Sequence, residues 1–165
     1  MAVWDVSRAH FYGIAERTVY TNLPEEMDEP GRAAKLLKTM YGTQDAAHIW
    51  GETWIPLLEE NQIKVGVSNR SVFGNRHARG LCHGDDFMVI ASAKTLREFG
   101  KILESKFDVR ITAMICFGPG YDKEVSMLSR TIRINDIENC VELEPDGKHV
   151  ARMIEDLELS RAKTA

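Results

Sequence analysis

Leu81-Cys-His-Gly-Asp-Asp-Phe-Met-Val-Ile90 places a glycine and two adjacent carboxylates between two short apolar runs. Apolar runs of this length on either side of a glycine predict two strands joined by a tight turn. Neighbouring side chains of a strand point to opposite faces of a sheet, so Asp85 and Asp86 serve one site only if the turn bends the chain between them. Gly84 permits that bend because it has no Cβ.

A third carboxylate, Asp5, lies in Ala2-Val-Trp-Asp-Val6, part of a predicted buried strand over residues 2–7. If this strand ends beside the turn, Asp5 meets Asp85 and Asp86. Crowded carboxylates raise each other's pKa unless a hard divalent cation binds among them through oxygen ligands. The three residues therefore form a candidate two-metal site for phosphoryl transfer, with Mg²⁺ or Mn²⁺ as the expected ion. The alternative for Asp85-Asp86 is a solvated hairpin turn.

The pattern of apolar residues along the rest of the chain predicts a mixed α+β fold. Residues at helical spacing predict helices over 45–60, 94–107 and about 147–158, and a short helix or turn at 10–15. Strands are predicted at 18–23, 108–115, 124–134 and 141–143. No internal repeat is present.

Local signals refine the two longer helices. Thr43 or Asp45 is available to cap the first helix, and Pro56 predicts a kink or break in it near Thr53. Thr95 followed by Glu98 fits a capping box at the start of the second helix.

Composition restricts the class of protein. The chain has 165 residues, 44% of them hydrophobic, which is enough for a packed core. No apolar stretch approaches the roughly 20 residues of a membrane span, and no basic-then-apolar leader is visible at the N-terminus. Three widely spaced cysteines indicate reduced thiols in an intracellular protein, cytoplasmic or nuclear. The net charge of −4 argues against a protein that chiefly coats nucleic acid.

Basic residues gather just before the predicted hairpin turn, at Arg70, Arg76, His77 and Arg79. This group is a candidate contact for a phosphate backbone. Its alternative is a solvated strand edge that charge protects from pairing with another chain.

Four sequence blocks occur in a distinctive order. They are Asp5-Val-Ser-Arg-Ala-His-Phe-Tyr-Gly13, Val19-Tyr-Thr-Asn-Leu-Pro24, Leu37-Lys-Thr-Met-Tyr-Gly-Thr-Gln-Asp-Ala-Ala-His-Ile-Trp50 and Gly84-Asp-Asp86. In this order the chain resembles the reverse transcriptase of copia-type retrotransposons, from about residue 3 to residue 159. The resemblance implies an RNA-directed DNA polymerase, a magnesium-dependent nucleotidyltransferase, with a palm-like antiparallel sheet whose helices pack on one face.

The resemblance also implies a role for particular residues. It makes Asp5, Asp85 and Asp86 the catalytic, metal-binding residues. The expected nucleotide contacts are Val6, Ser7, His10 and Asp45. The expected nucleic-acid contacts are His83 and Gly84, to which the basic group before the turn adds Arg76 and Arg79. Residues 1–144 would be a palm with partial fingers, and residues 145–165 the start of a thumb or connection segment. The implied partners are an RNA or DNA template-primer and a deoxynucleoside triphosphate, with no membrane involved.

Four residues depart from the family pattern. His10 stands where the family has an aromatic residue, usually Phe, Asp45 where it has Gln, and His83-Gly84 where it has Tyr-Val. His83-Gly84, the net negative charge and an expected lack of the fingers segment favour an alternative, a catalytically inactive or domesticated palm remnant that acts as a structural or interaction subunit of a larger assembly. The resemblance begins almost at Asp5, so an upstream fingers segment is expected to be missing and the isolated chain is expected not to extend a primer. A metal-dependent nuclease or cyclase on a similar sheet is a third possibility.

Overall fold

A computed structural model describes residues 1–27 and 29–158 and confirms the mixed α+β class. The chain divides into two compact units, Met1–Ile111 and Thr112–Ala165. The predicted palm and thumb regions, 1–144 and 145–165, are functional divisions and stay predictions. In the described part of the chain, no helix combines the length and the apolar character needed to cross a membrane.

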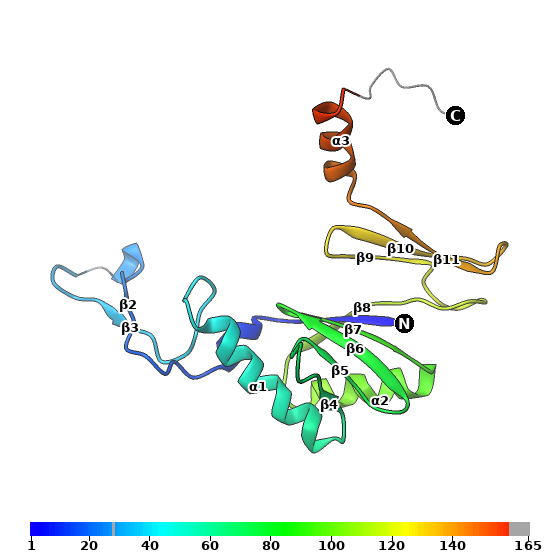
Figure 1. Cartoon of the computed structure of the whole chain (residues 1–165). Helices are drawn as coiled ribbons and strands as arrows, with labels where there is room; N and C mark the ends of the chain where they lie inside the picture. The colour runs from blue at the N-terminus through cyan, green and yellow to red at the C-terminus, as the bar shows by residue number, and fades with distance from the viewer. Residues whose placement is uncertain (28, 159–165) are drawn as a thin grey trace. The chain divides into compact units, whose positions relative to one another are not determined.

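A six-stranded sheet with the order β4-β5-β6-β7-β1-β8 forms the frame of the first unit, and its strand β8 continues three residues beyond Ile111 (Figure 1). Its strands are β1 (Ala2–Val6), β4 (Lys64–Val65), β5 (Val72–Gly74), β6 (Ala78–His83), β7 (Asp86–Ala91) and β8 (Val109–Met114). The first strand of the chain thus lies inside the sheet, between β7 and β8. It runs antiparallel to β7, which follows about 80 residues later in the sequence.

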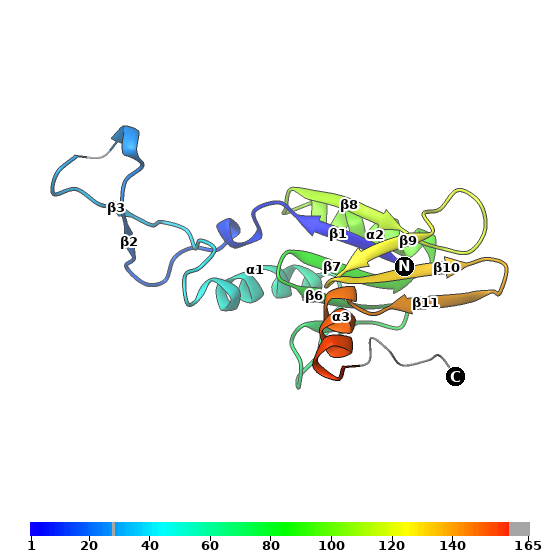
Figure 2. The same cartoon turned by 90° about the horizontal axis from the view of Figure 1, so that it is seen from above.

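Helices α1 (Ala46–Glu60) and α2 (Ala93–Glu104) cover one face of this sheet, as predicted (Figures 1 and 2). The alternation of side chains along β7 shows which face is covered. Phe87 and Val89 are fully buried beneath the helices, whereas Ile90 is 60% exposed on the opposite face. We call that opposite side, which neither helix covers, the open face of the sheet, although Val3 on it is buried.

Aromatic side chains fill the space between the sheet and the helices. The Phe87 ring lies 5.5 Å from Trp54 of α1 and 6.3 Å from Phe99 of α2, measured between ring centroids. Phe73 stacks on Phe99 at 5.6 Å. Gly80 makes room for this stack, since a Cβ there would lie 2.5 Å from the Phe73 ring. Burying each such ring stabilises the fold by about 1.5–3 kcal/mol.

The ends and interior of the two helices differ from the sequence expectations. The Ser92 hydroxyl caps α2 by accepting from the Thr95 amide at 3.3 Å, so the predicted cap at Thr95 is wrong by three residues. α1 continues through Pro56, and the break expected near Thr53 does not occur. Pro56 deprives only the exposed residue Glu52 of a partner for its carbonyl, while buried residues on both sides keep the helix against the sheet.

Residues 13–45 leave the sheet and return to it (Figures 1 and 2). They contain β2 (Tyr20–Thr21) and β3 (Ala34–Lys35), which pair with each other, and a 3-10 helix over Glu25–Met27. The strand predicted over 18–23 is therefore only two residues long. A two-stranded ribbon with no third layer gains little from burial, and Tyr20 is 64% exposed.

In the second unit, β9 (Glu124–Met127), β10 (Arg130–Asn135) and β11 (Cys140–Glu144) form an antiparallel sheet, followed by α3 (Gly147–Asp156). The region predicted as strand over 124–134 is thus a hairpin. The apolar residues of α3 and its C-cap, predicted to share a face, are 37–59% exposed: Val150, Met153, Ile154 and Leu157.

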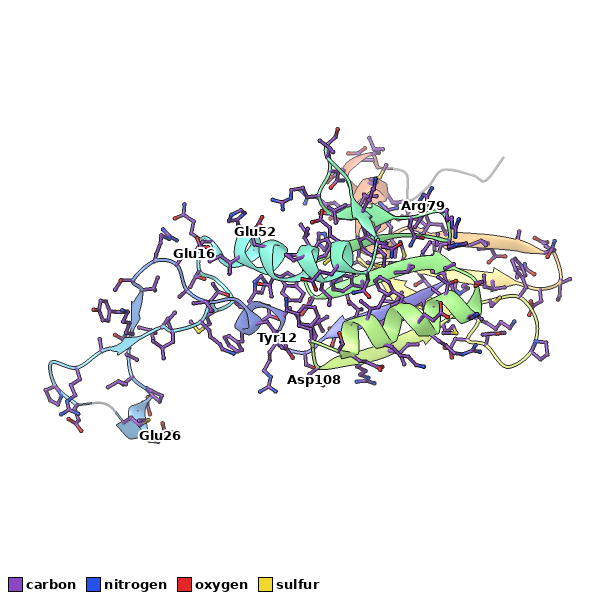
Figure 3. The ribbon with its side chains drawn as sticks, turned by 90° about the horizontal axis from the view of Figure 1, so that it is seen from below. Tyr12, Glu16, Glu26, Glu52, Arg79 and Asp108 are labelled. Carbon is purple, nitrogen blue, oxygen red and sulfur yellow. The ribbon has the colours of Figure 1, made fainter. Side chains whose placement is uncertain are left out.

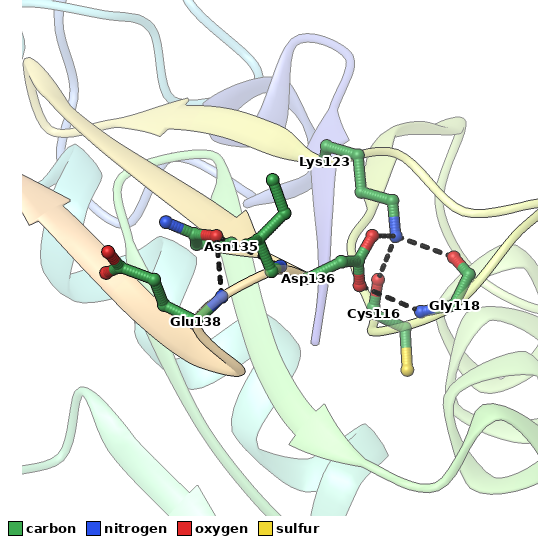
Figure 4. A network of polar contacts seen from close by, with 7 residues as sticks. Cys116, Gly118, Lys123, Asn135, Asp136 and Glu138 are labelled. Carbon is green, nitrogen blue, oxygen red and sulfur yellow. Dashed lines mark hydrogen bonds and ion pairs between the residues drawn. The ribbon is translucent and has the colours of Figure 1, made fainter.

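A polar network fastens the loop before β9 to the β10–β11 connection (Figure 4). The Lys123 ammonium contacts the Asp136 carboxylate at 2.6 Å and donates to the carbonyls of Cys116 and Gly118 at 3.0 and 2.6 Å. The Gly118 amide donates to the same carboxylate at 3.0 Å. These bonds lower the pKa of Asp136, first through Lys123 and then through the Gly118 amide.

Candidate metal centre

The register between β1 and β7 brings two of the predicted carboxylates together. Trp4 pairs with Phe87, and the next pair along the ladder is Asp5 with Asp86. Residues directly opposite each other have Cβ atoms about 4.5–5.5 Å apart. Trp4 and Phe87 both face the helices, so Asp5 and Asp86 both lie on the open face.

The third carboxylate sits at the tip of the β6–β7 hairpin. Gly84 and Asp85 form a two-residue turn closed by the pair His83 and Asp86, and Gly84 has φ +62°, a value that favours glycine. The Asp85 carbonyl accepts from the Val6 amide at 2.9 Å. The tip is therefore tied to the end of β1, beside Asp5.

Trp50 fixes the same turn from the helix side. Its indole Nε1 donates to the Gly84 carbonyl at 2.6 Å, while its ring is buried against Phe87 and Phe107. This contact of Trp50 could not be predicted from the sequence, because it depends on where α1 crosses the hairpin tip.

His83, Asp86 and Asp5 form a row across β6, β7 and β1, and Asp85 lies beside this row in the hairpin turn. This crowding raises the pKa of Asp86, first through burial and then through the charges of Asp85 and Asp5, with His83 acting in the opposite direction. Carboxylates that raise each other's pKa are stabilised in their charged forms by a nearby cation.

The three carboxylates fit a hard divalent cation, because they offer only oxygen ligands. Their oxygens do not all lie within 4.8 Å of one another. In the described residues, only one group of three possible ligands is that close together, and it lies in the second unit: Glu138, Cys140 and Glu142. Paired ions about 3.5–4 Å apart are shared between carboxylates and do not need all three oxygens at one point. Asp5, Asp85 and Asp86 would thus hold Mg²⁺ or Mn²⁺ together with oxygens from substrate or water.

Tyr41 is a site residue to which the sequence assigned no role. Its hydroxyl donates to Asp85 Oδ2 at 3.3 Å. Burial raises the pKa of Tyr41, as do the charges of Asp85 and, more weakly, Asp5. Tyr41 lies within the quoted block Leu37–Trp50, which was the available signal.

The predicted nucleotide contacts at the end of β1 already have partners. The Val6 amide donates to the Asp85 carbonyl, and the Ser7 amide donates to the Asp108 carbonyl, both at 2.9 Å. Close by, the Asp108 amide donates to the Tyr12 hydroxyl at 2.6 Å (Figure 3). Neither the Val6 nor the Ser7 amide is free for a triphosphate in this structure.

His10 and Asp45 lie in different settings. His10 belongs to the 3-10 helix Ala9–Tyr12, and its Nδ1 is buried with no hydrogen-bond partner in the described part of the chain. Asp45 occupies the N-cap position of α1, but its carboxylate binds Arg17 at 2.9 Å instead of capping the helix. That bond lowers the pKa of Asp45. It also pairs the negative charge that the family resemblance would place near a triphosphate.

The predicted nucleic-acid contacts form a strip along β6. Arg79 and His83 share the open face but are four residues apart, about 13 Å at the usual rise of a strand. Arg76 precedes β6 and its Nε donates to His77 at 2.8 Å. Figure 3 shows Arg79 well along the sheet from Tyr12 and Asp108, which mark the end where β1 stops. Gly84 and His83 are exposed at the hairpin tip.

A pocket of about 300 Å³ lies beside the same tip. Its walls include Trp50, Trp54, Arg70, Cys82 and His83. Burial raises the pKa of the Cys82 thiol to about 12, so this cysteine stays protonated and is not an activated nucleophile.

Comparisons of the chain with protein-family models, with curated proteins and with solved structures found no match. The arrangement of Asp5, Asp85 and Asp86 is therefore the feature on which a function has to rest. It is an acidic, rigidly held site at one end of an open sheet face.

Proposed function

We propose that this chain carries the palm of an RNA-directed DNA polymerase similar to copia-type reverse transcriptases. The reaction is transfer of a nucleotide to a primer 3′-hydroxyl with two Mg²⁺ or Mn²⁺ ions. The observation that supports it is the pairing of Asp5 with Asp86 beside a hairpin tip that carries Asp85. The sequence blocks that resemble the family contain these same three residues.

The chain's own residues supply position and charge. Asp5 and Asp85 would hold the ions, with Asp86 assisting. When bound, the ions would lower the pKa of the 3′-hydroxyl and neutralise charge on the leaving pyrophosphate. β1 and the hairpin hold the carboxylates through the Val6–Asp85 backbone bond, and Trp50 keeps the turn from shifting. Fixed groups of this kind contribute most of the catalysis in phosphoryl transfer.

The second candidate is a catalytically inactive palm remnant that serves as a structural or interaction subunit. The occupied amides of Val6 and Ser7 favour it, because they cannot donate to a triphosphate without a rearrangement of β1.

A Mn²⁺ titration followed by electron paramagnetic resonance, with and without a deoxynucleoside triphosphate, tests the proposal. We expect weak binding by the full chain, tighter binding with the nucleotide, and at least tenfold weaker binding in Asp5→Asn and Asp85→Asn. Asp156→Asn, an exposed aspartate on α3, is the matched control and should bind as the unmodified chain does.

The effect of nucleotide on Mn²⁺ binding separates the two candidates, because the isolated chain is expected not to extend a primer in either case, and primer extension on the same proteins checks that expectation. Equal Mn²⁺ binding by all variants would eliminate the two-metal site. Binding that depends on Asp5 and Asp85 but is not tightened by nucleotide, with no extension, would support the inactive remnant.

A further inference from the structure

We propose that Tyr41 is a positioning residue of the metal centre, which holds the Asp85 carboxylate in the orientation that receives the ion. This inference rests on the proposed function, because it assigns a role to a neighbour of a proposed metal ligand. It concerns a residue outside the set Asp5, Asp85 and Asp86.

The contact pattern singles out Asp85. The Tyr41 hydroxyl donates to its Oδ2 at 3.3 Å, whereas in residues 1–27 and 29–158 no side chain donates a hydrogen bond to Asp5 or Asp86. An O–H···O bond is usually 2.7–2.8 Å long, so this one is loose. Hydrogen bonds of a site without its substrate are often long and shorten when the complex forms.

The main chain holds Tyr41 independently of Asp85. Two residues earlier, Thr39 is 2% exposed, and its amide donates to the Gly13 carbonyl at 3.0 Å. Its hydroxyl donates to the His10 carbonyl. Gly13 permits this close approach, since a Cβ there would lie 2.9 Å from Thr39 Oγ1 and 2.5 Å from Ile49. The segment before Tyr41 is therefore clamped to the 3-10 helix Ala9–Tyr12.

Ring contacts fix the direction of the Tyr41 side chain. Its ring meets His10 edge-on at 4.4 Å and Phe11 at 6.1 Å between centroids. The side chain stays 45% exposed, which leaves the hydroxyl beside a site that ions can reach. These contacts thus determine the position of the hydroxyl, and the Asp85 carboxylate orients toward it.

The consequence for ion binding follows from the geometry of a carboxylate. An ionised aspartate accepts about four hydrogen bonds or metal bonds on its two oxygens. A donor on one side of Oδ2 selects a rotamer and leaves the other positions for a cation. Groups that orient a metal ligand in this way typically change metal affinity by about 10–100-fold.

Tyr41→Phe tests this role, because it removes only the hydroxyl and keeps the ring that contacts His10 and Phe11. In the Mn²⁺ titration we expect about tenfold weaker binding. Tyr20→Phe, a change at an exposed residue of β2, should leave the affinity unchanged. The thermal midpoint without metal should be the same for both variants, whereas a merely structural tyrosine would lower the midpoint and leave the affinity unchanged.

A double-mutant cycle with Asp85→Asn identifies the partner of the hydroxyl. In the Asp85→Asn background, Tyr41→Phe should cause no further loss of affinity. An independent readout is nuclear magnetic resonance of the chain with ¹³C-labelled tyrosine, in which Mn²⁺ should broaden the Tyr41 signal before that of Tyr20.

Each outcome of these experiments decides a different point. Equal affinity of the unmodified chain and Tyr41→Phe would overturn the inference alone. Full additivity with Asp85→Asn would also overturn it, because the hydroxyl would then act elsewhere. Failure of the unmodified chain to bind Mn²⁺ would overturn the proposed function together with the inference.

Discussion

Asp86 carries a charge that the fold tolerates poorly without a cation. It faces Asp5 directly across the ladder and follows Asp85 in the chain, and burial adds to the cost. Like charges directly opposite each other on a sheet are destabilising, by about 0.2–1 kcal/mol. Sites that need such a group for function commonly lose stability by keeping it.

Asp86→Asn should therefore stabilise the metal-free chain at pH 7, by about 0.2–1 kcal/mol. The pKa of Asp86 in the folded chain is raised above its ordinary 3.8, so the folded state holds this proton more tightly than the unfolded state does. The contribution of Asp86 to stability therefore falls as the pH rises from 3.8 through the folded-state pKa. The gain from Asn should be complete above the folded pKa and disappear below about pH 3.8. Urea unfolding at pH 7 and at pH 4 measures it.

Asp156→Asn is the control for that experiment. It removes a charge that pairs with Arg152, so it should not stabilise the chain at either pH. A gain from Asp86→Asn that is the same at pH 4 and pH 7 would contradict an electrostatic origin.

Gly84 determines the conformation of the turn that carries Asp85. Gly84→Ala should destabilise the fold by about 1–2 kcal/mol, because a side chain at φ +62° is strained although nothing lies within 4 Å of the added Cβ. The strain would be relieved by a shift of the turn, which should also weaken Mn²⁺ binding. Calorimetry with and without Mn²⁺ separates the two effects, and an unchanged midpoint would show that the turn accommodates alanine.

At the level of elements, the cap of α2 shows where sequence reasoning lost accuracy. Ser92, Thr95 and Glu98 all suit a helix start, and the sequence favoured the Thr95–Glu98 pair. The helix begins earlier because β7 ends at Ala91, which leaves Ser92 as the last residue with an extended backbone before the first helical residue, Ala93. The position at which β7 ends thus determines which residue caps the helix.

Ser92→Ala should cost about 1 kcal/mol of unfolding free energy, because the Thr95 amide loses its acceptor. Thr95→Ala should cost less, since it leaves that bond in place. Chemical denaturation of both variants compares them, and a larger loss from Thr95→Ala would restore the predicted capping box.

At the scale of the whole molecule, alternation and resemblance predicted the fold class and the meeting of Asp5 with the hairpin. Both predictions depend on the alternation of side chains along β1, β6 and β7, and the strands of the sheet show this alternation. The role of Tyr41 was not predictable, because it depends on how residues 13–45 return to the 3-10 helix. The Arg17–Asp45 pair was missed for the same reason, since 28 residues separate its members.

The net charge of −4 governs how the chain meets nucleic acid. We expect weak binding to a template-primer duplex, with a shallow dependence of affinity on salt. Arg79→Gln should reduce the salt slope by about 1 if Arg79 contacts a phosphate, and Arg32→Gln, in the excursion away from the sheet, should not. Fluorescence anisotropy at several salt concentrations measures the slopes, and equal slopes would remove Arg79 from the interface.

The position of β1 between β7 and β8 has a consequence for the order in which the chain folds. Its partners are made some 80 to 110 residues later, so the strand that carries Asp5 cannot pair while the chain is being synthesised up to that point. Such long loops close slowly. The β6–β7 hairpin, by contrast, is local and forms on its own in microseconds. Asp85 and Asp86 should therefore take up their places early, and Asp5 should join them in the last step, when the sheet closes around the first strand.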